Sequence, residues 1–175
     1  MDSTPELVVL LSEDGLRIGT ADKAGVHTTD TPLHLAFSCH LFRENGDVLV
    51  TRRALSKSTW PGVWTNSFCG HPAPDETVED AIMRRAREEL GVQVEKILPV
   101  LPDFRYRAVD ASGVVENEIC PVYRATLVGE VQPEATEVAE FAWVDPVKLA
   151  AAVSATPFAF SPWLRLQLSQ LGALH

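Results

Sequence analysis

The stretch from Trp64 to Gly91 constrains the fold more than any other part of the chain, because it joins an extended segment to a helix signal. Cys69 and His71 stand two residues apart within it. Side chains alternate along an extended strand, so these two are expected to point to the same side. Pro72 and Pro74 then end the strand.

A helix is predicted to follow these prolines. Asp75 or Thr77 can cap its start, and Gly91 suits its end. Apolar residues recur at helical spacing and predict its buried face, namely Val78, Ala81, Ile82, Ala86 and Leu90. Charged residues gather toward its far end, namely Arg84, Arg85, Arg87, Glu88 and Glu89. A thiol, an imidazole, guanidinium groups and carboxylates in one strand-turn-helix unit indicate a functional site.

Length and charge bound the class of protein. A chain of 175 residues with 46% hydrophobic and 22% charged residues is expected to form a single domain over 1–175. The net charge of −9 argues against general affinity for nucleic acid, whose phosphates favour a basic surface. An anionic ligand would therefore need a local basic cluster.

Neither a membrane nor an oxidising compartment is expected. No apolar run reaches the length needed to cross a bilayer, and the start MDSTPE lacks the basic region of a secretory signal. Cys39, Cys69 and Cys120 are odd in number and far apart, which fits neither a disulfide framework nor a cysteine zinc site. These features predict a cytoplasmic protein.

The remaining pattern mixes strands with a few helices. Strands are predicted over residues 7–11, 16–20, 33–42, 48–51, 92–98, 114–126 and 137–144. A polar loop is expected over 21–32, and Pro121 is expected at an edge or bulge of its strand. Asp145-Pro146 and Ser161-Pro162 each start a helix. Because most strand pairs are joined as hairpins, we expect an α+β sandwich and no doubly wound parallel sheet.

Two carboxylates and three imidazoles form a candidate metal site. Glu116 and Glu118 share one face of their strand, where they repel each other unless a cation joins them. His27, His34 and His71 can complete a site for Zn²⁺, Mn²⁺ or a similar ion. The alternative is a solvated strand face with structural histidines. His40 and His175 are interpreted as structural.

Basic residues near these segments are candidates for an anion pocket. Arginine binds phosphate oxygens in a fork, and lysine adds a point charge. The candidates are Lys23, Arg52, Arg53, Lys57, Arg84 and Arg85. The alternative is that they are ordinary surface charges.

The segment that begins at Gly70 resembles the Nudix box, G-x5-E-x7-R-E-U-x-E-E-x-G-U, where U is aliphatic. Glu76, Arg84 and the pair Glu88-Glu89 match it. Arg85 stands where the family has a metal-binding glutamate, and a cation there should weaken metal binding by repulsion. The resemblance implies a Nudix-type α/β/α sandwich with mixed, largely antiparallel sheets. It puts pyrophosphate hydrolysis in doubt.

A wider match is more specific. The pieces TRRALSKSTWPGVWTNSFCGHP, FRYRA, ENEICPVY and FSPWL, in this order, resemble the type I isopentenyl-diphosphate Δ-isomerase family over about 23–166. That resemblance implies an isomerase of isoprene biosynthesis that interconverts isopentenyl and dimethylallyl diphosphate, acting as a monomer or weak homodimer. The alternatives are a Nudix hydrolase of a nucleoside diphosphate derivative and a non-catalytic binding module.

The resemblance also implies a role for each matching residue. The catalytic residues would be Cys69, Glu118, Tyr106 and Trp163. The ligands of a Mn²⁺ or Zn²⁺ ion would be His27, His34, His71, Glu116 and Glu118. The diphosphate would be bound by Lys23, Arg53, Lys57 and Arg85, and its Mg²⁺ by Glu89. Glu118 is expected to protonate the alkene and the Cys69 thiolate to remove a proton, although the two roles could be reversed.

Overall fold

The computed structural model describes residues 6–172 and 174, and its secondary structure is dominated by strands. The strands are β1 (Leu7–Leu11), β2 (Arg17–Asp22), β3 (His34–Leu35), β4 (Phe37–Phe42), β5 (Val48–Arg53), β6 (Trp64–Thr65), β7 (Phe68–Gly70), β8 (Gln93–Leu101), β9 (Arg105–Val109), β10 (Val115–Ile119), β11 (Val122–Val128) and β12 (Val138–Val144). The helices are α1 (Lys23–Val26), α2 (Val78–Leu90), α3 (Pro146–Ala155) and α4 (Pro162–Leu171), with a 3₁₀ turn at Pro157–Ala159. Among the described residues, no helix combines the length and apolar character needed to cross a membrane.

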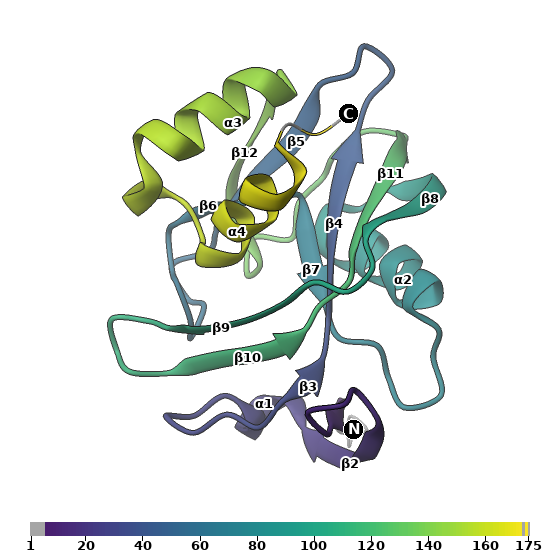
Figure 1. Cartoon of the computed structure of the whole chain (residues 1–175). Helices are drawn as coiled ribbons and strands as arrows, with labels where there is room; N and C mark the ends of the chain where they lie inside the picture. Colours follow the sequence, from purple (N-terminus) through teal and green to yellow (C-terminus); the bar gives the residue numbers. More distant parts are fainter. Residues whose placement is uncertain (1–5, 173, 175) are drawn as a thin grey trace.

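The strands form two sheets (Figure 1). One has the order β2-β1-β3-β10-β9, and the larger one has the order β12-β5-β4-β11-β8 with β6 and β7 attached to β5 and β4. Two strand pairs, β3 with β10 and β4 with β11, are parallel, and the other pairs are antiparallel. The prediction of an α+β fold with mixed, largely antiparallel sheets is confirmed.

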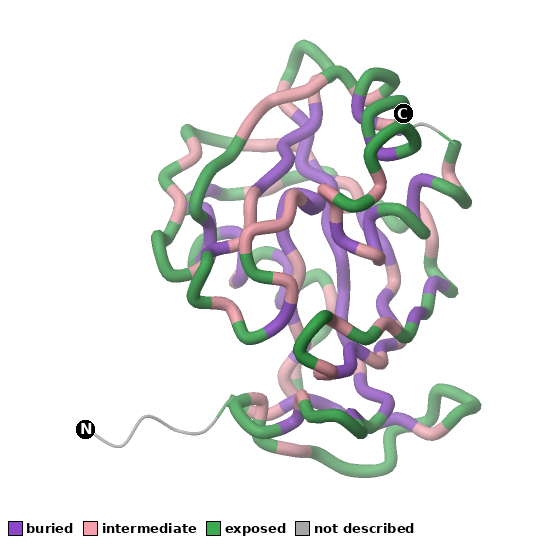
Figure 2. Tube along the Cα trace, turned by 90° about the vertical axis from the view of Figure 1, so that its left-hand side faces the viewer, coloured by how far each residue is buried: buried purple, intermediate pink, exposed green. Residues whose placement is uncertain are grey.

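Helices cover both faces of the larger sheet (Figure 1). Along β4, Phe37, Cys39 and Leu41 pack with α2, whereas Phe42 packs with α3 and α4. Side chains alternate along a strand, so the two helical layers receive alternate residues of the same strand. Buried segments accordingly gather in the strands between the layers (Figure 2).

The central helix has the ends that its sequence indicates. Of the two possible caps, Thr77 is the one used, and its hydroxyl accepts from the backbone nitrogen of Asp80. Gly91 ends the helix with φ of 67°, a left-handed conformation that glycine adopts without strain. Asp145 and Ser161 cap α3 and α4 in the same manner as Thr77 caps α2.

Two predicted strands were wrong in extent because each one changes sheets. The predicted strand 33–42 divides at Ala36 into β3 and β4, and the predicted strand 114–126 divides at Cys120-Pro121 into β10 and β11. Pairing continues across both breaks, since Ala36 N donates to Ile119 O at 3.0 Å and Ser38 N to Pro121 O at 3.1 Å. The predicted loop 21–32 contains the short helix α1, and His175 lies outside the described residues.

A test of this packing is Gly70→Ala. A Cβ atom at Gly70 would lie 2.8 Å from Cγ of Arg85 and 2.8 Å from Cε1 of Phe37, closer than real contacts allow. We expect the free energy of unfolding, measured with urea, to fall by about 1–3 kcal/mol. The control is Gly19→Ala, because a Cβ there meets no described atom within 4 Å. Equal stability of the two variants would contradict the close packing of α2 on β7.

Candidate active site

A cavity of about 830 Å³ collects residues from both sheets and from the helices α1, α2 and α4. Every residue to which the family resemblance gives a role lines it except His34, which is fully buried. The lining residues from the prediction are Lys23, His27, Arg53, Lys57, Cys69, His71, Arg85, Glu89, Tyr106, Glu116, Glu118 and Trp163. The structure therefore places Cys69 and Glu118, far apart in sequence, in the wall of one cavity.

The carboxylate of Glu118 lies between two imidazoles. Glu118 is directly opposite His34 in the parallel pair of β10 with β3, and its Oε1 lies 3.3 Å from His34 Nε2. The same oxygen lies 3.0 Å from His71 Nε2. Tyr106, opposite Glu118 on β9, donates its hydroxyl to the other oxygen at 2.9 Å.

A second carboxylate adjoins this group. Glu116 Oε2 lies 3.0 Å from His27 Nε2, and Glu116 Oε1 accepts from the hydroxyl of Thr59 at 2.8 Å. Glu116 and Glu118 are thus on one face of β10, as the spacing predicts, and both are buried. Two carboxylates held this close in a buried place repel each other unless positive charge lies nearby.

These residues fit a divalent cation. One potential ligand atom from each of His27, His34, His71 and Glu118 lies within 4.8 Å of the others. In the described part of the chain, the buried Nε2 atoms of His27 and His34 and Oε2 of Glu116 lie at ion-pair distance from their partners but without the alignment of a hydrogen bond. His34 Nδ1 lies 2.9 Å from the carbonyl of Pro32, a contact that directs the Nε2 lone pair inward. Imidazole and carboxylate ligands suit transition metals.

The surroundings of Glu118 favour its charged form. Burial alone would raise the pKa of its carboxyl group, but hydrogen bonds and charge from His34 and His71 lower it well below its usual value. The pKa of His34 is raised, because the contact with Glu118 outweighs the opposing effect of burial. Burial lowers the pKa of His71, so of these two imidazoles only His34 has its charged form favoured.

The Cys69 thiol lies between a hydrogen-bond acceptor and a hydroxyl group. Its Sγ donates to Asn66 Oδ1 at 3.3 Å and lies 3.4 Å from Ser38 Oγ, directly across the strand pair of β7 with β4. Burial raises the pKa of this thiol to about 12. The sulfur therefore carries its proton at neutral pH in the ligand-free protein.

Aromatic rings close one end of the cavity. The Trp163 ring lies 5.8 Å from that of Tyr106 and 5.5 Å from that of Trp60. The guanidinium carbon of Arg53 lies 5.3 Å from the centre of the Trp163 ring, so this ring already has a cation over it. Trp163 is only 3% exposed, which means that little water reaches this end.

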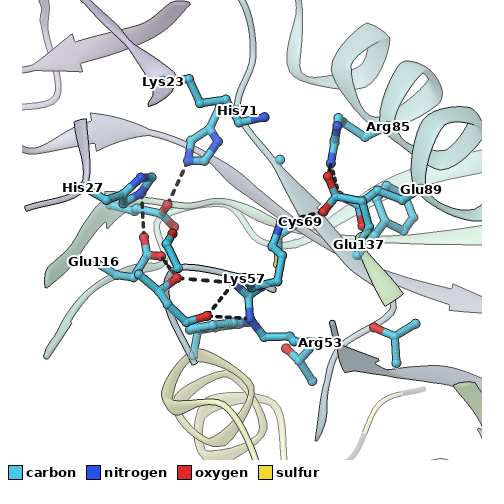
Figure 3. A pocket seen from close by; sticks show the side chains of 18 of the residues that line it. Lys23, His27, Arg53, Lys57, Cys69, His71, Arg85, Glu89, Glu116 and Glu137 are labelled. Atoms are coloured by element: carbon cyan, nitrogen blue, oxygen red, sulfur yellow. Dashed lines mark hydrogen bonds and ion pairs between the residues drawn. The ribbon is translucent and has the colours of Figure 1, made fainter. Parts of the chain in front are cut away.

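Charged side chains gather at one end of the cavity, where Arg85, Glu89 and Glu137 lie across Cys69 from His27 and Glu116 (Figure 3). Arg85 forms ion pairs with Glu89 and with Glu137, the latter at 3.4 Å, and Lys57 pairs with Glu137. Burial is the main cause of the raised pKa of Glu89. Lys57 and Arg85 are thus held in the cavity by the carboxylates of Glu89 and Glu137. This gives the acidic chain a local group of cations that an anion could bind.

Two candidates for the anion pocket lie outside this cavity. Arg84 binds both carboxylate oxygens of Glu76 and donates to the backbone carbonyl of His71 at 3.2 Å. Arg52 lies 3.5 Å from Glu140 and donates to the carbonyl of Gly62. Arg84 supports the segment that carries His71, and Arg52 supports the connector after β5.

Sequence reasoning missed several residues that shape the site. Asn66 is part of the quoted TNSFCGHP piece, but no role was inferred for it. Ser38 stands in a mostly apolar strand and Gln167 is one of several polar residues in the last helix, so neither gives a signal of its own. Glu137 begins a predicted strand, and only its pairing with Lys57 and Arg85 in space reveals its place in the cavity.

Comparisons with known proteins agree with this geometry. The NUDIX domain family matches residues 32–164. The isopentenyl-diphosphate Delta-isomerase of Clavibacter michiganensis subsp. michiganensis is 63% identical over all of this chain and 90% of its own length. The protein of the same name from Leifsonia xyli subsp. xyli is 66% identical over 96% of this chain and 92% of its own length.

Among solved structures, the crystal structure of DR0079 from Deinococcus radiodurans is similar with a TM-score of 0.72. It covers 94% of this chain and 98% of its own, at 20% identity. Identity this low supports the shared fold and nothing finer.

The fit to a cation predicts that the protein binds Mn²⁺ or Zn²⁺ through the histidine-carboxylate cluster. In isothermal titration, we expect His27→Gln to weaken this binding by at least roughly tenfold, since loss of a supporting contact alone has such an effect. Glu44→Gln, at an exposed position outside the cluster, is the matched control. Unchanged affinity in His27→Gln would show that the ion binds elsewhere.

Proposed function

Since the chain belongs to the Nudix family and, within it, to the isopentenyl-diphosphate Delta-isomerases, we propose that it interconverts isopentenyl diphosphate and dimethylallyl diphosphate in isoprene biosynthesis. The observation that carries the proposal is one cavity lined by a thiol, a carboxylate, aromatic rings and basic side chains. The substrate has two matching parts, because its alkene is apolar and its diphosphate is anionic.

The reaction moves a double bond by adding one proton and removing another. Protonation of the terminal alkene carbon leaves positive charge on the tertiary carbon, and loss of a proton from the neighbouring CH₂ forms the new double bond. Two proton-transfer groups must therefore reach the same five-carbon chain. Cys69 and Glu118 are the two candidates in the cavity wall.

We assign protonation of the alkene to Glu118 and removal of the allylic proton to Cys69. Because the thiol carries the proton and the carboxylate is charged in the ligand-free protein, this assignment requires one proton to pass from Cys69 to Glu118 before the alkene is protonated. The Tyr106 hydroxyl donates to Glu118 and steadies its carboxylate through the transfer. Burial makes the Cys69 thiolate a stronger base than an exposed one, because burial raises the pKa of its thiol. In the reverse direction the two residues exchange roles.

The aromatic end protects the positive charge. An indole face stabilises a desolvated cation by ~2 kcal/mol or more, and Trp163 offers such a face. Trp60, Phe104 and Tyr106 surround it in an apolar cluster. Water must stay out, because it would trap the cation as an alcohol.

The basic end holds the diphosphate. Lys23, Arg53, Lys57 and Arg85 are the proposed ligands, and Glu89 is proposed to bind the Mg²⁺ that accompanies it. Each cation is already positioned, since Lys23 pairs with Glu6 at 2.8 Å and Arg53 donates to the carbonyl of Thr59. Held in this way, an allylic diphosphate is less prone to leave.

The metal cluster supports the acid. We propose that His27, His34, His71, Glu116 and Glu118 bind one Mn²⁺ or Zn²⁺ ion, which would strengthen Glu118 as an acid by withdrawing charge from it. A single domain over 1–175, working in the cytoplasm as a monomer or weak homodimer without nucleic acid or membrane partners, stays a prediction from the sequence.

Incubation with isopentenyl diphosphate in D₂O tests the activity. We expect dimethylallyl diphosphate that contains deuterium, because the added proton comes from a group that exchanges with solvent. Mass spectrometry of the product gives the result, and a phosphate-release assay in the same mixture tests the hydrolase alternative. Phosphate release without deuterated product would replace the isomerase with a hydrolase.

Cys69→Ala tests the thiol. We expect kcat to fall by at least about 100-fold, the usual contribution of a proton-transfer group, with little change in the urea unfolding midpoint. The control is Cys39→Ala, which removes a thiol on the opposite face of β4, in the core against α2. That variant should lose stability and keep its turnover. Normal turnover in Cys69→Ala would remove the sulfur from the reaction.

A further inference from the structure

A chain of buried hydrogen bonds reaches from the last helix to the Cys69 sulfur. Gln167 on α4 donates its amide nitrogen to Ser38 Oγ at 2.9 Å, and Ser38 Oγ lies 3.4 Å from Cys69 Sγ. Both Gln167 and Ser38 are 0% exposed. Water is therefore not available to replace either partner, and the direction of each hydrogen bond matters.

At the far end of the chain, His40 is the partner of the amide oxygen. Gln167 Oε1 lies 2.9 Å from His40 Nε2, and an amide oxygen can only accept, so His40 donates. Burial lowers the pKa of His40 to about 4, which leaves its ring neutral with a single N–H. With its oxygen engaged by His40, the amide presents its N–H group to Ser38.

At the near end, the Ser38 hydroxyl lies against two sulfur atoms. The Cys69 thiol donates to Asn66 Oδ1, an atom that only accepts. Ser38 Oγ accepts from Gln167, so its own hydrogen is free to point at a sulfur. Cys69 Sγ and Cys120 Sγ each lie 3.4 Å from that oxygen. Of these two sulfurs, Cys69 is the one that lines the cavity.

The same helix also reaches the other neighbour of the thiol. Trp163, four residues before Gln167 and so on the same side of α4, donates its indole N–H to Asn66 Oδ1 at 3.0 Å. Asn66 in turn donates to the carbonyls of Cys39 and Phe68. The last helix therefore contacts both groups that flank the sulfur.

We propose that Gln167 is a positioning residue for the reaction, because its amide turns the Ser38 hydroxyl so that it donates to the Cys69 sulfur. The inference rests on the proposed function in taking Cys69 as a group that gives and takes a proton. A donor at 3.4 Å would stabilise the sulfur when it has lost its proton. Gln167 itself touches no substrate and acts through Ser38.

The test compares Gln167→Met with Gln170→Met. Methionine resembles glutamine in length and has no amide, and Gln170 is exposed on the same helix. We expect Gln167→Met to lower kcat about tenfold or more and to change KM less than about twofold, because a hydrogen bond to a charged group is lost. Ser38→Ala should have the same effect, and the double variant should be no slower than either one.

A second measurement does not need turnover. Iodoacetamide alkylation of Cys69, followed by peptide mass spectrometry at one pH, should be several-fold slower in Gln167→Met and in Ser38→Ala than in Gln170→Met. Urea unfolding shows that each variant is folded. If Gln167→Met does not fold, Ser38→Ala decides the outcome.

The outcomes separate the two proposals. If the parent protein turns over and Gln167→Met matches Gln170→Met in kcat and alkylation, the positioning role is wrong. A loss of stability without a change in kcat also overturns it, since that is the result of a purely structural role. If the parent does not isomerise isopentenyl diphosphate, the proposed function fails, and the alkylation rates still decide whether Gln167 acts on the sulfur.

Discussion

The site depends on two chain segments, β3–β4 and β10–β11, that run parallel to each other. Both pass from the smaller sheet into the larger one, and they remain neighbours in both sheets. Backbone hydrogen bonds at Ala36 and Ser38 keep β3–β4 paired with β10–β11 across both breaks. Before the break, the pairing of β3 with β10 places His34 opposite Glu118. After the break, the pairing of β4 with β7 places Ser38 opposite Cys69. Backbone pairing therefore holds the Glu118 carboxylate and the Cys69 thiol in one cavity.

Charge is the second constraint, because an acidic chain has to receive an anion. The net charge of −9 opposes a diphosphate, and the cavity meets this with basic groups, of which Lys23, Lys57 and Arg85 are paired with glutamates in the ligand-free protein. Glu137, for example, lies between Lys57 and Arg85. Such pairs avoid the cost of a buried unpaired charge and leave the cations in position for a ligand that competes for them.

Local signals predicted the central helix, its Gly91 end, the two Pro-initiated helices and the mixed class of the fold. The points at which two segments pass from one sheet to the other were not predictable. Ala36 stands between the apolar residues Leu35 and Phe37, with no residue that signals a break. Pro121 indicates an interrupted strand, but it does not show which strand pairs with it. Motif resemblance named residues that the structure brings to one cavity, with the fully buried His34 beside it. It could not reveal Ser38 or Gln167, whose importance comes from being buried beside a sulfur that is distant in sequence.

The placement of α4 has a consequence for how the enzyme is made. The histidines and glutamates proposed as metal ligands all precede residue 119, whereas Trp163 and Gln167 follow residue 162. During translation the ligand cluster can assemble while the final helix is still inside the ribosome. The nascent chain would then pass through a stage in which the sulfur lacks its cover, and oxidants would have their best access to it at that time.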